Sequence, residues 1–274
     1  MKDFPSCFGE SGVQVADSSP PTTTRAQNQV ACIYQYTSQS FSGFITVTWM
    51  KNLMVQALSI AIENSANDSL GKVDIRPWLF SKRKGFKKMV VDSTKVDIYW
   101  DLSSAKFGSS PEPLEGFYLA IAINQELCLL LGDSQTEAYK KIDPSPFAPK
   151  ASFLARKEHI FGKRLYNSKA QFCGKGRLHD IRIEFDPNER CGKCLTMLVD
   201  RKVVLQVTHL QWKFRGNQTI LVDGVCVEVY WDVHGWLFDS AIFLFRTHVP
   251  VAKAGPLEGL SHGFSLVLCA WKSE

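Results

Sequence analysis

Hydrophobic and polar residues alternate along most of this chain with a period of two. In Val96–Asp101, Asp180–Phe185 and Val227–Asp232, every second side chain is apolar and the residues between are polar. Successive side chains of a strand point to opposite faces of a sheet, so this pattern predicts strands with one face in a core. No long segment has the period of 3.6 residues that marks an amphipathic helix, and the best short candidate is Ser134–Lys141, with Ser134 as its N-cap.

The predicted strands are short and follow one another at intervals of about ten residues, which is typical of a sandwich or a barrel. Asp223-Gly224 is the strongest hairpin signal, because glycine tolerates the positive φ of a tight turn. Lys82–Gly85 and Lys213–Gly216 are interpreted as the turns that precede two matching strands. We expect strands near residues 30–37, 41–50, 54–63, 71–80, 86–92, 95–101, 116–124, 126–132, 151–161, 168–173, 178–186, 195–200, 202–209, 218–223, 225–231, 241–248 and 262–271.

The chain repeats part of its own sequence. Leu79–Asp101 aligns with Leu210–Asp232 without gaps, and Pro113–Gly116 recurs as Pro256–Gly259. A repeat of this length predicts an internal duplication, and we expect residues kept in both copies to have structural roles. In the longer alignment, the identical residues of the first copy are Leu79, Lys82, Gly85, Val91, Asp92, Val96, Tyr99, Trp100 and Asp101.

Together these patterns predict an all-β fold of two sandwich-like antiparallel halves that are related by the internal duplication. Residues 1–29 are expected to be a disordered tail, because the run Ser18–Arg25 is polar and rich in proline, serine and threonine. We place the first β repeat at 30–142 and the second at 151–274. Residues 143–150 form a proline-rich joint between them, since proline continues neither a central strand nor a helix.

Composition narrows the class of protein. The chain has 274 residues, of which 45% are hydrophobic, and its net charge of +5 is small for a nucleic-acid-binding domain. It contains no apolar run long enough for a transmembrane helix, and its first residues lack the apolar segment of a secretion signal. We therefore expect a soluble, cytoplasmic or nuclear protein whose 8 cysteines are reduced thiols.

The closest pair of cysteines, Cys191 and Cys194, has the spacing of a metal-binding or redox motif. Zinc needs four ligands, and nothing in the sequence requires Cys173 and His179 to supply the other two. A redox pair normally opens a helix in a βαβ unit, which this region lacks. We interpret the two thiols as flanking a turn, and we expect neither a metal nor a cofactor.

Two common motifs for catalysis are missing from the sequence. The chain has no glycine-rich phosphate loop and no His-Glu-x-x-His. Asp101 and Asp232 end the two copies of the repeated strand, and we interpret them as turn-forming residues rather than as paired catalytic carboxylates. The sequence assigns no catalytic residue and favours a protein that is not an enzyme.

Two segments are candidates for contact with a partner. A basic cluster, placed at a hairpin tip, could bind the phosphates of an anionic membrane or of nucleic acid, and the alternative is a solvated turn or a sheet edge protected by charge. An apolar loop after the second repeated strand could bind a protein, and the alternative is that it covers the end of a sandwich. The basic cluster consists of Lys82, Arg83, Lys84, Lys87 and Lys88, and the loop contributes His234, Trp236 and Phe238.

Several long segments resemble a known family. They are Val47–Met54, Pro77–Phe80, Val96–Gly108, Pro111–Tyr118, Arg156–Gly162 and Leu210–Gln218. Together they resemble the plant proteins grouped as domain of unknown function family 868, over nearly all of residues 30–271. The resemblance implies a plant origin and an all-β domain, and it supplies no reaction, ligand or catalytic residue.

These observations favour a non-enzymatic binding or interaction module. Its strand edges and loop ends would bind a protein partner that the sequence does not identify. One alternative is a peripheral membrane module that binds anionic lipid through the basic cluster. Another is an enzyme with an unrecognised site, which would bring Asp232, His234 and a cysteine or serine into one deep pocket.

Overall fold

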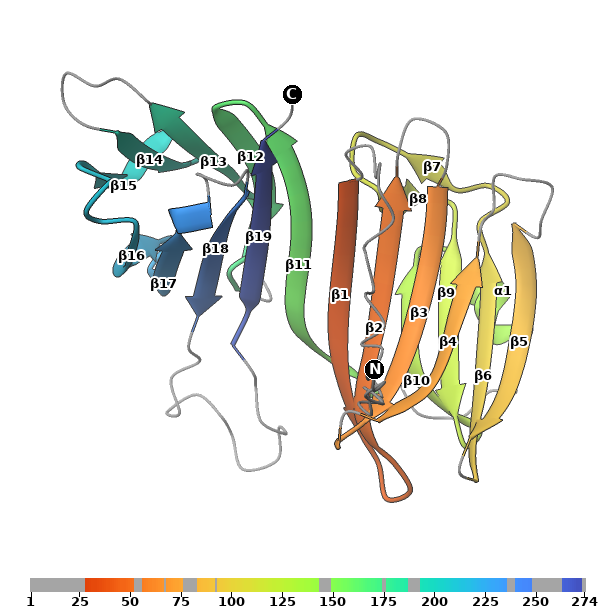
Figure 1. Cartoon of the computed structure of the whole chain (residues 1–274). Coiled ribbons are helices and arrows are strands. Elements are labelled where there is room, and N and C mark those ends of the chain that lie inside the picture. Colours follow the sequence, from red (N-terminus) through yellow and green to blue (C-terminus); the bar gives the residue numbers. More distant parts are fainter. Residues whose placement is uncertain are drawn as a thin grey trace, which may run out of the picture.

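Strands make up most of the described chain (Figure 1). The computed structural model describes residues 28–51, 56–66, 68–75, 83–91, 93–142, 149–173, 176–186, 193–235, 240–247 and 263–272. The first half contains β1 (Asn28–Thr37), β2 (Ser42–Lys51), β3 (Gln56–Asn64), β4 (Ser69–Ile75), β5 (Lys84–Val91), β6 (Thr94–Asp101), β7 (Lys106–Phe107), β8 (Pro113–Glu115), β9 (Tyr118–Ile123), β10 (Glu126–Gly132) and α1 (Gln135–Tyr139). The second half contains β11 (Ser152–Gly162), β12 (Leu165–Ala170), β13 (His179–Asp186), β14 (Cys194–Val199), β15 (Lys202–Val207), β16 (Arg215–Val222), β17 (Val225–Asp232), β18 (Ser240–Thr247) and β19 (Ser265–Lys272).

The all-β class predicted from the sequence is confirmed. Alternation identified β6 correctly, since Val96 and Ile98 are fully buried and their neighbours along the strand are not. The helix forms inside the predicted segment, with Ser134 at its N-cap position but without a side-chain capping hydrogen bond. The very short strands β7 and β8 were not predicted. Among the described residues, no helix has the length and apolar character needed to cross a membrane.

Parts of the predicted organisation lie outside the described residues. These are residues 1–27 of the expected tail and residues 143–148 of the expected joint. Asn28 and Gln29, which we assigned to the tail, are instead the first residues of β1. The boundaries of the two halves stay a prediction.

One sheet runs through both halves (Figure 1). Its nine strands lie in the order β16-β17-β18-β19-β11-β1-β2-β3-β4, so that β11 joins the strands of the second half to β1 of the first. The pair β11/β19 is parallel and the other pairs of this sheet are antiparallel. The predicted halves therefore share a continuous hydrogen-bonded sheet.

Two four-stranded sheets cover this long sheet, with the orders β10-β9-β6-β5 and β12-β13-β14-β15. Val47, Cys32, Arg156 and Leu266 are directly paired in a row across β2, β1, β11 and β19. Directly paired residues of neighbouring strands point to the same face of a sheet. Val47 lies in the core of the first half and Leu266 in the core of the second. The two small sheets therefore cover the same face, with Cys32 and Arg156 between the two cores.

The repeated motif has matching surroundings in the two halves. A side chain at Gly85 would begin 2.7 Å from the ring of Trp100, and one at Gly216 would begin 2.3 Å from the ring of Trp231. These glycines lie within β5 and β16, so the turns predicted there are wrong. Glycine is required because the indole of the neighbouring strand packs directly on its backbone. The duplication itself stays a prediction that this match supports.

Candidate functional site

A cleft of about 1600 Å³ separates the first half from the second small sheet. Its floor includes Glu158 of β11, one wall is formed by β12, and the opposite wall is the segment 109–112 before β8. A short turn after Gly162 folds β12 back over β11. The missing side chain of Gly162 leaves room there, because a Cβ would lie only 2.2 Å from the carbonyl oxygen of Leu165.

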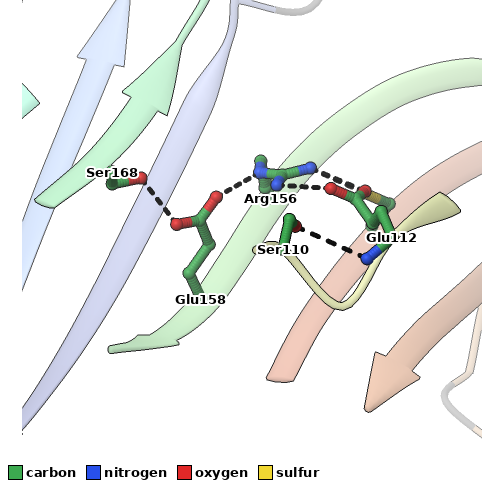
Figure 2. Close-up of polar contacts among 6 residues, drawn as sticks. Ser110, Glu112, Arg156, Glu158 and Ser168 are labelled. Carbon is green, nitrogen blue, oxygen red and sulfur yellow. Dashed lines mark hydrogen bonds and ion pairs between the residues drawn. The ribbon is translucent and has the colours of Figure 1, made fainter. Parts of the chain in front are cut away.

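Arg156 is the centre of a hydrogen-bonded cluster in the cleft floor (Figure 2). Its two terminal nitrogens donate to the carboxylate of Glu112, at 2.8 Å and 2.6 Å, as a bidentate pair. Its Nε donates to Oε1 of Glu158, and the Ser168 hydroxyl donates to Oε2 of Glu158 at 2.5 Å. The cluster thus joins the first half, β11 and β12 through side chains.

Burial and charge determine the protonation of the groups around Arg156. Burial works against the guanidinium charge, but the hydrogen bonds to Glu112 and the charge of Glu158 raise the pKa of Arg156 above its usual value. Burial raises the pKa of the Cys32 thiol to about 12, and the charge of Glu112 adds to this shift. Cys32 is therefore a neutral thiol that points at Glu112, 3.6 Å from its Oε1, and it is not an activated nucleophile.

The cluster has more negative than positive charge. Two carboxylates surround one guanidinium, and the Glu158 side chain is only 8% exposed. All three charge-assisted contacts of Arg156 go to these carboxylates, so the guanidinium has little capacity left for an anion. The carboxylate oxygens keep acceptor capacity, because each oxygen has two lone pairs. The floor is thus better suited to a hydrogen-bond donor or a cation than to an anion.

An aromatic row extends the cleft floor away from the cluster. The rings of Tyr34 and Phe153 have centroids 5.6 Å apart, and Phe153 stacks on Phe264 at 6.1 Å. Phe264 then meets Phe172 edge-on at 5.8 Å. Phe153, Phe172 and Phe264 line the cleft. A ligand could therefore bury apolar groups on this row and place a polar group at Arg156 and Glu158.

A model of a plant protein family of unknown function, DUF868, matches residues 25–272. The chain belongs to this family. The resemblance found in the sequence is thereby confirmed. No curated protein and no solved structure matches the chain.

The sequence predicts that the basic cluster lies at a hairpin tip. In this DUF868 protein it lies elsewhere. Lys84, Lys87 and Lys88 lie along β5, the edge strand of the first small sheet, and the turn to β6 lies at the other end of β5. Lys84 forms an ion pair with Asp101 at 2.6 Å. Arg83 directly precedes β5, and Lys82 lies outside the described residues. The basic cluster was predicted at the wrong place because Gly85 was interpreted as a turn residue. Its role is instead to make space for the indole of Trp100.

The expected partner loop is described only at its start. The backbone N–H of His234 donates to Asp232 at 3.1 Å, and the His234 ring packs on Phe214 with centroids 5.2 Å apart. Trp236 and Phe238 lie outside the described residues. Neither His234 nor Asp232 lines the cleft of the DUF868 protein.

The candidate metal ligands do not come together in the described part of the chain. Cys173 is exposed at the cleft, whereas His179 is buried with its ring nitrogens 2.8 Å from Asp200 and 3.4 Å from Asp223. Cys194 lies beside Gln206, and Cys191 is not described. No group of three or more His, Cys, Asp or Glu side chains in the described ranges has a metal-binding arrangement.

Sequence reasoning did not single out Glu112, Arg156, Glu158 or Ser168. A signal was present, since Arg156 and Glu158 are two residues apart on a predicted strand and so share one face. Which face they share depends on the pairing of β11 with β1 and β19, and the alternation within β11 does not reveal it.

Proposed function

We propose that the protein is a non-enzymatic binding module whose ligand occupies the cleft between the first half and the second small sheet. The observation that carries this proposal is the large, mostly apolar cleft with one polar cluster in its floor. Concave, largely apolar sites with a few well-placed polar groups are typical of binding sites. The neutral Cys32 and the pairing of Arg156 with two carboxylates support a positioning role for the cluster rather than a catalytic one.

The six described cysteines are free thiols. Free thiols support the proposal that the protein is located in a reducing compartment, the cytoplasm or the nucleus.

Binding of the neutral dye Nile red tests the proposal, because its fluorescence reports an apolar site without selecting for charge. Ser109 is exposed at the cleft wall, so Ser109→Trp should fill the entrance and weaken dye binding at least about tenfold. Ser104→Trp is the matched control, since Ser104 is exposed nearby in the chain but does not line the cleft. Absence of dye binding, or equal binding by the wild-type protein and both variants, would refute the proposal.

A second candidate function is binding of anionic lipid by β5. Phe86 and Val90 are 66% and 68% exposed on β5 and share a face with Lys84 and Lys88. Exposed apolar residues between lysines are typical of surfaces that rest on a membrane interface. The alternative is that the lysines only protect the sheet edge from pairing.

Co-sedimentation with vesicles distinguishes these two interpretations of β5. Lipid binding predicts that the protein sediments with mixed phosphatidylserine and phosphatidylcholine vesicles and not with phosphatidylcholine alone. Neutralising Lys82, Arg83, Lys84, Lys87 and Lys88 should abolish this, and Phe86→Ser should weaken it. Binding that is absent, or that survives neutralisation, leaves edge protection as the role of these residues.

A further inference from the structure

We propose that the ligand of the cleft is an extended basic peptide that adds as a strand to the free edge of β12. The inference rests on the proposed function and names the class of ligand. In the described part of the chain β12 pairs with β13 on one side, and no strand pairs with its other side. That side faces the cleft, whose lining also includes residues 109–112 of the first half. β12 lies over β11, to which it is joined by the hydrogen bond from Ser168 to Glu158.

The hydrogen-bonding direction of each β12 residue can be derived from its pairing with β13. Phe185 donates its N–H to the carbonyl of Arg164 at 2.8 Å, which makes this a hydrogen-bonded pair immediately before the pair Leu165/Glu184. Hydrogen-bonded and non-hydrogen-bonded pairs alternate along an antiparallel ladder. Every second residue of β12, starting with Leu165, therefore directs its N–H and C=O away from β13.

The residues that meet this condition are Leu165, Asn167 and Lys169, and all three line the cleft. The carbonyl of Leu165 is turned toward Gly162. Asn167 and Lys169 keep both backbone groups directed into the cleft, where an incoming strand would lie about 4.8 Å away. Main-chain pairing of this kind is a common mode of peptide recognition.

The size of the cleft favours a peptide over a small molecule. Sites for small molecules are typically about 300–1,000 Å³, whereas this cleft is about 1600 Å³. Alternate side chains of an added strand would point down to the floor, at the level where Ser168 meets Glu158. The opposite side chains would point to solvent.

Charge at the floor determines which peptide fits. The carboxylates of Glu112 and Glu158 outnumber the guanidinium of Arg156, and the cluster lies largely away from water. A lysine or arginine side chain of the peptide would compensate the excess negative charge, whereas an acidic side chain would add to it. Three further basic residues line the cleft, namely Lys169, Arg182 and Arg201. Lys169 is paired with Asp180 at 3.6 Å and Arg182 with Glu184 at 2.6 Å, so the preference for a basic side chain is confined to the floor around Glu112 and Glu158.

The test is selection from a library of random peptides about six residues long, the usual length of a strand. Wild-type protein should enrich peptides with Lys or Arg at alternate positions, and a labelled selected peptide then serves as the probe in fluorescence anisotropy. Asn167→Pro removes one inner-facing N–H and obstructs the edge, without removing a bond to β13. It should weaken peptide binding at least about tenfold.

Gln206→Pro is the matched control, on the opposite edge of the same sheet. Asp200 donates its N–H to Asp180, and by the same alternation Gln206 of β15 directs its N–H outward, away from the cleft. This variant should bind the peptide within about twofold of the wild type. Both variants should keep the wild-type far-ultraviolet circular dichroism.

The proposal is overturned if no peptide is enriched, if the selected peptides lack basic residues, or if both proline variants lose binding equally. It is also overturned if the protein dimerises in sedimentation experiments and Asn167→Pro abolishes this, because a second copy would then occupy the edge. Nile red binding that Ser109→Trp blocks, without peptide enrichment, would reject the peptide and leave the proposed binding function standing. Failure of both assays rejects both.

Discussion

Arg156→Met removes the guanidinium that joins Glu112 to Glu158 and leaves two carboxylates in the cleft floor. The Arg156 side chain is 21% exposed and that of Glu158 is 8% exposed, so water replaces the lost contacts poorly. Breaking a buried ion pair by removing one partner costs about 3–5 kcal/mol, because a charge stays buried without compensation. We therefore expect the free energy of unfolding to fall by about this amount, with methionine keeping much of the apolar stem packing.

Arg182→Met is the matched control for this loss. Arg182 forms an Arg–Glu pair with Glu184 at 2.6 Å, but the two side chains are 50% and 39% exposed. Pairs at the surface contribute about 0–1 kcal/mol, so this variant should lose less than about 1 kcal/mol. The two substitutions change the same residue types on strands of the same half, and they differ mainly in burial.

Urea denaturation, followed by tryptophan fluorescence and circular dichroism, measures both losses from the shift of the midpoint at constant slope. A combined Glu112→Gln, Arg156→Met and Glu158→Gln variant should regain much of the stability, since no charge is then left buried. The reasoning fails if Arg156→Met lies within about 1 kcal/mol of the wild type. It also fails if the neutral triple variant is no more stable than Arg156→Met alone.

Gly216→Ala should lower the free energy of unfolding by about 1–3 kcal/mol, because the new methyl group would overlap the ring of Trp231. Urea denaturation measures this loss, and a stabilising effect would contradict the packing of Trp231 on Gly216. Burial raises the pKa of Cys32 to about 12, so this thiol should resist a thiol reagent at mildly alkaline pH until the protein unfolds. Mass spectrometry of the modified peptides measures the labelling, and rapid labelling of Cys32 in the native protein would contradict the prediction. The hydrogen bond from His179 lowers the pKa of Asp200 from its ordinary value of 3.8. The ionised Asp200 therefore stabilises the folded protein fully above pH 3.8, and this stabilisation is lost as the pH falls below that value. Asp200→Asn should therefore reduce the acid sensitivity of unfolding, and an unchanged acid transition would argue against this pair.

The strands could be predicted because alternation is a local property. The apolar residues of β6 and β17 that repeat every second position are the buried ones, and Asp223 and Gly224 form the predicted turn with φ of 48° and 80°. Local patterns failed at Gly85, where the deciding contact is an indole on the neighbouring strand. A glycine required by a turn and a glycine required by a packed aromatic ring cannot be distinguished from the sequence alone.

The order of the strands could not be predicted from the pattern. β11 lies between β1 and β19, which are far from it in the chain, and alternation is compatible with either neighbour on either side. The contact of Arg156 with Glu112 spans 44 residues and depends on this order. The cleft therefore could not be found from the sequence, because its walls come from elements that only the sheet topology brings together.

The distribution of repeated residues supports the proposal that the ligand binds at the junction of the two halves rather than within either half. Trp100 and Trp231 each pack on a glycine within their own half, and Asp101 and Asp232 each pair with a basic residue at the start of the neighbouring strand. These contacts support the expectation that the repeated residues have structural roles. Arg156 instead connects the segment before β8 to the floor beneath β12, and it is positioned by the continuous sheet that both halves share. A site that needs both halves can bind a ligand only when β11 holds them in one sheet, which couples ligand binding to the integrity of the whole molecule.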